Sequence, residues 1–284
     1  MSVMGEPRVV RGGTDDGRVT RPSLGLFLTE PARGLADLAG LWMAAPWLSL
    51  APRGDQHGVL VLPGLLASDS STVLLRWFLG WLGYDVRGWS LARNLGPTDQ
   101  VLDEMPRMLS ALAGQTGGPV SLIGQSLGGI YARELARDHP RLVRQVITLA
   151  SPFALADARQ SRAHGVYQRH AHRHAPAGRV PTLEQVARPI EVPSTAVYSR
   201  WDGIVSWQSC VEPETAWHEN VEVRCGHLGF GVDPATLWLV ADRLAVPAGQ
   251  WRGFRPPPAL RALYPRRRGP RLSWPAFNPA RRTA

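Results

Sequence analysis

Short apolar runs alternate with helical hydrophobic patterns along most of this chain, and this alternation limits its fold more than any other feature. Runs typical of buried strands lie at residues 57–64, 84–89, 119–124, 143–151, 194–199 and 220–225. Patterns typical of helices lie between or after them, at residues 71–82, 97–115, 127–137 and 233–245. Strands that alternate with helices predict an α/β fold with a mostly parallel central sheet and helices on both faces.

The same patterns divide the chain into a body and its appendages. The 284 residues, 44% of them hydrophobic, suffice for one large core. We expect residues 1–23 to be disordered and residues 24–246 to form one domain, with a polar insertion at about 153–190 as its lid or cap. Residues 247–284 are rich in proline and arginine, and we expect a basic tail with little packed structure.

The net charge of +9 lies in this last part of the chain. Residues 251–284 contain nine arginines and no acidic residue, which leaves 23 basic and 23 acidic residues in residues 1–250. A balanced body predicts no specific nucleic-acid partner, whereas the tail leaves open a weak contact with an anionic surface.

The chain shows no sign of a secretory leader or a membrane span. Its N-terminus lacks an apolar segment of the kind that signal peptides need. The most apolar run, residues 38–51, is shorter than the roughly 18 residues that cross a bilayer. We expect it to be a helix that covers the core, in a cytoplasmic protein. The alternative is peripheral docking of Trp42 and Trp47 at a membrane interface.

A Gly-x-Ser-x-Gly sequence joins the apolar run at 119–124 to the helical pattern that follows. Its members are Gly124, Gln125, Ser126, Leu127 and Gly128. A strand–turn–helix context of this kind is required for a nucleophile elbow, in which a sharp turn exposes the serine. We therefore predict Ser126 as a nucleophile, with a glycine turn of no chemical role as the alternative.

A serine nucleophile needs a base, and the base needs an acid that orients it. Asp202 follows the run at 194–199, and His227 follows the run at 220–225. Because the carboxyl ends of parallel strands lie at one edge of a sheet, we predict Asp202 as the acid and His227 as the base. A turn-forming aspartate and a structural histidine are the alternatives. Asp233 is a rival acid, but its sequence context favours a helix N-cap.

Such a site also needs backbone N–H donors for the negative oxygen that develops during attack. Leu127, directly after the serine, supplies one. The loop after the first strand supplies the other, and Leu65 is the best candidate, followed by Leu66.

With these pieces in place, the sequence resembles the α/β-hydrolase superfamily and, within it, bacterial lipase- and esterase-like hydrolases. The matching segments are LVLPGLLASD, LIGQSLGGIYARELA, VYSRWDGIV and GHLGFGVDP, within residues 24–246. The stretch GWSLARNLGPT, at residues 88–98, is also similar to one found in that group. The resemblance implies a catalytic triad of Ser126, His227 and Asp202, and an oxyanion hole formed by Leu65 and Leu127.

The chain departs from the common lipase pattern at two places. Pro63 precedes Gly64 where many lipases have histidine, and Gln125 precedes the serine where many have histidine. The insertion at 153–190 lies where many members of the superfamily have a lid or cap.

We expect a serine carboxylester hydrolase that acts on a small-molecule or lipid ester and needs no cofactor. The alternatives are an acyltransferase with the same triad and a non-catalytic binding module. Four histidines in the insertion alternate with arginines that would repel a cation, so we predict no metal site there. They are His164, His170, His172 and His174. Cys210 and Cys225 are expected to be free thiols, with a single bridge as the alternative.

Overall fold

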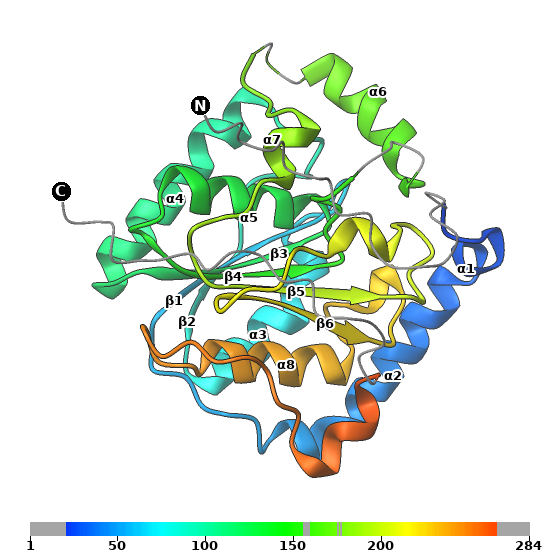
Figure 1. Cartoon of the computed structure of the whole chain (residues 1–284), viewed down its shortest axis with the longest axis vertical. Coiled ribbons are helices and arrows are strands. Elements are labelled where there is room, and N and C mark those ends of the chain that lie inside the picture. Colours follow the sequence, from blue (N-terminus) through cyan, green and yellow to red (C-terminus); the bar gives the residue numbers. More distant parts are fainter. Residues whose placement is uncertain (1–20, 156–159, 175, 177, 266–284) are drawn as a thin grey trace, which may run out of the picture.

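The computed structural model describes residues 21–155, 160–174, 176 and 178–265, and these contain one six-stranded sheet (Figure 1). Every neighbouring pair of strands is parallel, in the order β2-β1-β3-β4-β5-β6. The strands are β1 (Gly58–Leu62), β2 (Asp85–Arg87), β3 (Val120–Gln125), β4 (Val143–Leu149), β5 (Ser194–Ser199) and β6 (His218–Val223). The predicted α/β fold with a parallel sheet is confirmed.

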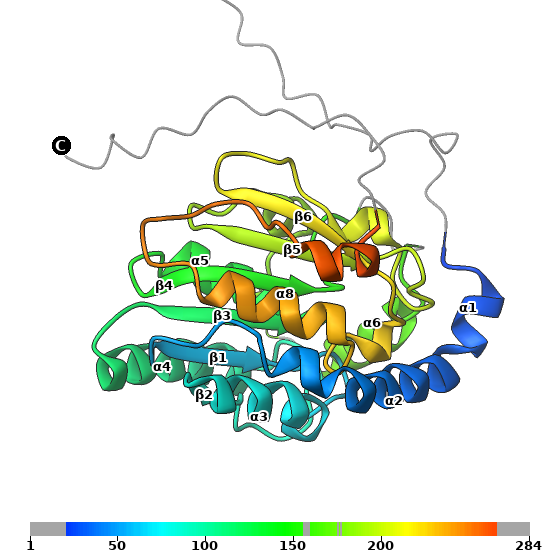
Figure 2. The same cartoon turned by 90° about the horizontal axis from the view of Figure 1, so that it is seen from below.

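Helices cover both faces of the sheet (Figure 2). One face packs against α3 (Val73–Leu82) and α8 (Pro234–Leu244), and the other against α4 (Asp99–Thr116) and α5 (Leu127–Asp138). Successive residues of β1 alternate between these two cores, with Val59 on the α3 and α8 side and Leu60 on the α4 and α5 side. A strand that is buried on both faces needs apolar residues at every position, which explains its continuous apolar sequence.

Two helices precede the sheet, α1 (Leu24–Leu28) and α2 (Glu30–Leu48). Only one side of α2 meets the core, through Leu41, Ala44 and Leu48. Trp42 and Met43 are 77% and 83% exposed, so the predicted core-covering helix covers the core on one side only. Docking of Trp42 and Trp47 at a membrane interface stays a prediction. None of the helices in the described ranges combines the length and the apolar character needed to cross a membrane.

The segment after α8 differs from expectation. Leu260 and Tyr264 are buried in the same core as α8, and the hydroxyl of Tyr264 donates to the C=O of Ala235 over 2.8 Å. The backbone N–H of Phe254 donates to Glu219 over 2.7 Å. The prediction of little packed structure is therefore wrong for residues 254–264, because apolar side chains interleave with the arginines there. Residues 1–20 and 266–284 lie outside the described residues. The expected disorder of most of the N-terminal segment and the expected lack of structure in the rest of the tail therefore stay predictions.

Within the insertion at 153–190, the structure describes α6 (His164–His174) and α7 (Leu183–Ala187). The start of this insertion is attached to the loop after β5. Ser161 and Val205 form an antiparallel bridge, and the N–H of Arg162 donates to the C=O of Ile204 over 2.8 Å. The role of the insertion as a lid stays a prediction.

A buried ion pair fixes α5 against the later strands. Arg133, which is fully buried, donates to Glu212 over 2.8 Å and to the C=O of Arg188 over 3.1 Å. Glu212 also accepts a hydrogen bond from the hydroxyl of Ser194 in β5. Burial opposes ionisation of Glu212, but the charges of Arg133 and His218 hold its pKa below the ordinary value. The pair is therefore charged at neutral pH and joins α5 to β5.

We expect Glu212→Gln to lower the free energy of unfolding by about 3–5 kcal/mol, because it leaves the Arg133 charge buried without a partner. Urea denaturation at pH 7 measures this change. Glu104→Gln is the matched control: it breaks an exposed pair with Arg107 and should cost no more than about 1 kcal/mol. Equal losses in the two variants would contradict a structural role for the buried pair.

Candidate active site

Ser126 occupies a strained turn between β3 and α5. Its φ and ψ are 51° and −119°, a conformation that residues with a side chain rarely adopt and that costs about 1–3 kcal/mol. The surrounding backbone holds it there: the N–H of Ser126 donates to the C=O of Leu149 over 2.8 Å, and its C=O accepts from Gly129 over 3.0 Å. The side chain of Ser126 therefore lies at the carboxyl end of β3 and at the start of α5.

The two outer glycines of the motif let backbone pass close to backbone. A Cβ atom added to Gly124 would lie 2.3 Å from the carbonyl oxygen of Gly128. A Cβ atom added to Gly128 would lie 2.3 Å from the carbonyl oxygen of Leu62 in β1. Both distances are far inside van der Waals contact, so glycine is required at both positions for α5 to leave β3 at this angle.

Asp202 and His227 lie on neighbouring loops at the carboxyl ends of β5 and β6. The Nδ1–H of His227 donates to Oδ2 of Asp202 over 2.6 Å. The other carboxylate oxygen accepts the N–H groups of Ile204 and Val205, each over 2.7 Å. Because Nδ1 carries the proton, Nε2 of the neutral imidazole is an acceptor. The arrangement gives His227 the tautomer that a general base needs.

The charge of Asp202 outweighs the burial of His227. Burial alone would lower the pKa of His227, but the nearby charge and hydrogen bond of Asp202, with a further contribution from the charge of Glu30, raise it above the ordinary value. The imidazolium is thus stabilised inside the protein, which is the electrostatic requirement for a base that takes up a proton.

The loop of His227 also contacts the turn that contains Ser126. The side-chain amide of Gln125 donates to the C=O of His227 over 3.1 Å. Within the described residues, no hydrogen bond joins Ser126 to His227 directly. The structure thus pairs Asp202 with His227 and links Gln125 to the same loop, and proton transfer from Ser126 belongs to the proposal below.

Backbone bonding and position in the cavity distinguish Leu65 and Leu66, the two candidates for the second oxyanion donor. The N–H of Leu66 donates to the C=O of Asn94 over 2.7 Å. Leu127 is the first residue of α5, so its N–H has no partner within the helix. Leu65 and Leu127 line the same cavity as Ser126. These observations favour Leu65 over Leu66 as the second donor.

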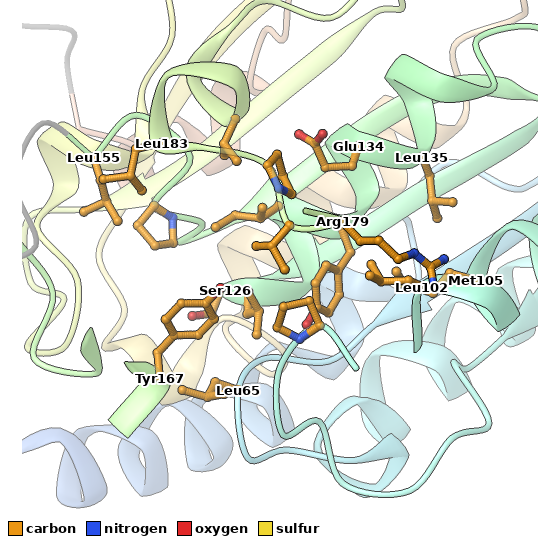
Figure 3. Close-up of a pocket in the computed structure, with 18 of the residues that line it drawn as sticks. Leu65, Leu102, Met105, Ser126, Glu134, Leu135, Leu155, Tyr167, Arg179 and Leu183 are labelled. Atoms are coloured by element: carbon orange, nitrogen blue, oxygen red, sulfur yellow. The ribbon is translucent and has the colours of Figure 1, made fainter. Parts of the chain in front are cut away.

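Ser126 opens into an apolar cavity of about 230 Å³ (Figure 3). The cavity runs along α5 from Ser126 as far as Asp138, between α4 and the insertion. Its apolar lining includes Leu102, Met105, Ile130, Leu135, Leu155 and Tyr167. At the far end lies Arg179, which is paired with Asp99 over 2.7 Å and with Asp103 over 2.6 Å.

No family model matches the chain, and a search of curated proteins finds no match. Solved structures do resemble it. Lipase B of Aspergillus fumigatus is 16% identical with a TM-score of 0.50, over 67% of this chain and 52% of the lipase. A thioesterase domain from the curacin biosynthetic pathway is 17% identical with a TM-score of 0.46, over 67% of this chain and 92% of that domain. A monoacylglycerol lipase of Paleococcus ferrophilus is 14% identical with a TM-score of 0.45, over 68% and 96%.

The chain has the α/β-hydrolase fold. The strand order, the parallel pairing and the strained serine turn agree with this assignment. The matched region spans about half the length of lipase B, and at these identities the likeness concerns the fold alone.

The sequence did not identify Asn94, which holds the loop after β1 in this α/β-hydrolase fold. Asn94 is fully buried, and its amide donates to the C=O of Pro63 over 2.9 Å. Its own C=O accepts the N–H of Leu66. The only sequence signal for Asn94 was its place in the stretch GWSLARNLGPT. This signal was not enough, because a lone asparagine in a loop indicates a turn more often than a buried support.

The other residues that the sequence offered as candidates for catalysis, disulfide formation or metal binding can also be located in the structure. Asp233 caps α8 by accepting from the N–H of Thr236 over 2.8 Å. Cys210 and Cys225 are buried free thiols, and burial raises the pKa of both. In the part of the chain that the structure describes, no group of His, Cys, Asp or Glu side chains could hold a metal ion. The side chains of His172 and His174 lie outside that part.

A second Ser–His–Asp array lies at the opposite edge of the sheet. His57 contacts Asp55 through Nδ1 and the hydroxyl of Ser121 through Nε2, the latter over 2.8 Å. Ser121 is fully buried and does not line the cavity. Burial lowers the pKa of His57 despite the contact with Asp55. This array resembles the candidate site in residue types, but no substrate can reach its serine.

We expect the imidazole of His227 to titrate above 6.5, the ordinary value, because of Asp202. In Asp202→Asn the burial of the ring should dominate, and the midpoint should fall. Titration of the histidine resonances by NMR measures both values, with His57 as an internal control that titrates below 6.5 in both proteins. An unchanged midpoint for His227 in Asp202→Asn would contradict this electrostatic account.

Proposed function

We propose that the protein is a serine hydrolase that cleaves carboxylic esters through an acyl-enzyme intermediate. One observation supports this most strongly: the 2.6 Å hydrogen bond between His227 and Asp202, at the same sheet edge as the strained Ser126 turn. An oriented base and an acid paired with it are the groups that activate a serine hydroxyl as a nucleophile, and Ser126 is partly exposed.

In this proposal Nε2 of His227 removes the proton of Ser126 as Oγ attacks the ester carbonyl. Asp202 stabilises the imidazolium that forms. The N–H groups of Leu65 and Leu127 donate to the negative oxygen of the tetrahedral intermediate. His227 then protonates the leaving alcohol, and water attacks the acyl-enzyme with His227 again acting as the base. Besides the substrate, the scheme uses side chains and backbone groups of this chain and one water molecule.

The cavity favours a substrate whose acyl chain lies beside α5. Its lining next to Ser126 is apolar, from Leu65 to Tyr167 (Figure 3). Each buried methylene group contributes roughly 0.8 kcal/mol to binding. An ester whose acyl chain extends from Ser126 along α5 therefore gains affinity with each carbon that the cavity holds.

We expect Ser126→Ala to lower kcat for p-nitrophenyl butyrate by at least about 1,000-fold, because it removes the nucleophile. Combining it with His227→Ala should add little, since the two groups act as a unit. Ser121→Ala is the matched control, because it removes the serine of the buried array and should keep kcat within about threefold. Hydrolysis by Ser126→Ala at the wild-type rate would contradict the proposal.

We expect p-nitrophenyl octanoate to have a higher kcat/KM than p-nitrophenyl acetate, because only the longer chain fills the cavity. Ile130→Trp places a large ring in the lining next to the first turn of α5. This variant should lose most activity toward octanoate and keep activity toward acetate. Equal losses for both esters would show that the acyl chain does not lie along α5.

A further inference from the structure

The first turns of α2 lie against the two loops that contain Asp202 and His227. Three charged side chains on this part of the helix point to these loops: Glu30, Arg33 and Asp37. Glu30 is 2% exposed although its helix lies at the surface. A buried carboxylate at the start of a helix needs hydrogen-bond donors to compensate for lost water. The donors here come from the two loops.

The acid loop is held on both sides of Asp202. The N–H of Gly203 donates to Oε1 of Glu30 over 2.6 Å. Arg33 donates to the C=O of Trp201 and also pairs with Oε1 of Glu30 over 2.8 Å. The residues immediately before and after Asp202 are thus both attached to α2.

The base loop is held in the same way on both sides of His227. The N–H of Leu228 donates to Oε2 of Glu30 over 3.2 Å. The N–H of Gly226 donates to Asp37 over 3.3 Å. One carboxylate, that of Glu30, therefore accepts a hydrogen bond from each loop with its two oxygens.

The loops approach the N-terminal helices too closely for larger residues. A Cβ atom on Gly203 would lie 2.5 Å from the carbonyl group of Leu26, and one on Gly226 would lie 2.8 Å from Oε2 of Glu30. The contacts are therefore part of a packed interface, whose spacing sets where the two loops lie.

We propose that Glu30 is a positioning residue, which joins the Asp202 and His227 loops and thereby sets the geometry of the acid–base pair. This inference rests on the proposed hydrolase function. Glu30 does not touch the substrate in this account. It acts through the backbone of Gly203 and Leu228, and through its negative charge near the imidazole.

Several charged groups surround His227, and among the residues that the structure describes Glu30 is one of two that favour its imidazolium. Asp202 contributes most and Glu30 contributes further. Arg33 partly balances the charge of Glu30, and Asp37 and Asp233 lie next to the base loop. Loss of the charge on Glu30 should therefore make His227 easier to deprotonate, whereas a mere loss of stability would leave its titration unchanged.

The test compares Glu30→Gln with Glu104→Gln, which breaks the exposed Arg107–Glu104 pair on α4, also of i,i+3 spacing. We expect Glu30→Gln to lower kcat for p-nitrophenyl butyrate about 10- to 100-fold, with KM within about threefold, because the catalytic pair is misplaced. The acid limb of its pH–kcat profile and the NMR midpoint of His227 should both move to lower pH. Glu104→Gln should match the wild type in all three measurements.

Glu30→Asp separates the effect of the negative charge from the effect of the side-chain length. It keeps the charge but is one methylene shorter, so it should lose part of kcat and keep the acid limb of the wild type. This variant also serves if Glu30→Gln does not fold. If Glu30→Gln folds, an unchanged kcat together with an unchanged His227 midpoint would overturn the inference. If it does not fold, an unchanged kcat in Glu30→Asp would overturn it. Loss of activity in Ser126→Ala tests the hydrolase function separately, so the two failures are distinguishable.

Discussion

This structure depends on one constraint: two segments of backbone must pass each other with no side chain between them. At the turn between β3 and α5, Gly124 faces the carbonyl of Gly128, and Gly128 faces the carbonyl of Leu62, with no room for a Cβ atom. The close packing compels Ser126 to adopt a positive φ. The strain is local, and the cost is offset by the core that β1, β3 and α5 bury together. The same turn determines both the path of the central helix and the exposure of the serine.

The second constraint is electrostatic. Two carboxylates, Asp202 and Glu30, are buried close to one imidazole, and each has its own backbone donors. Such donors stabilise a buried charge without neutralising it, so the carboxylates still favour a proton on His227. The hydrogen bonds that both loops donate to Glu30 in α2 add a mechanical link, because neither loop can move without changing its contact with this side chain. Position and charge are therefore supplied by the same side chain.

Much of the fold could be predicted from sequence, and less of the site. The apolar runs that became β1 and β3 are continuous because both of their faces are buried, so each could be located within a few residues. Asp202 and His227 were predicted from their places after strands, and the structure places them in contact. Glu30 gave no such signal, because an acidic residue in a first helical turn is expected for favourable interaction with the helix dipole alone. The contacts of Asn94 and Tyr264 depend on segments far apart in sequence, which no local pattern reveals.

The proposed function requires that Ser126 is a nucleophile activated by His227 and Asp202. The most direct measurement is treatment of the folded protein with a fluorophosphonate probe, followed by peptide mass spectrometry to locate the adduct. We expect one adduct, on Ser126, whose rate of formation falls sharply in Asp202→Asn. An adduct on another serine, or no adduct on the folded protein, would contradict it.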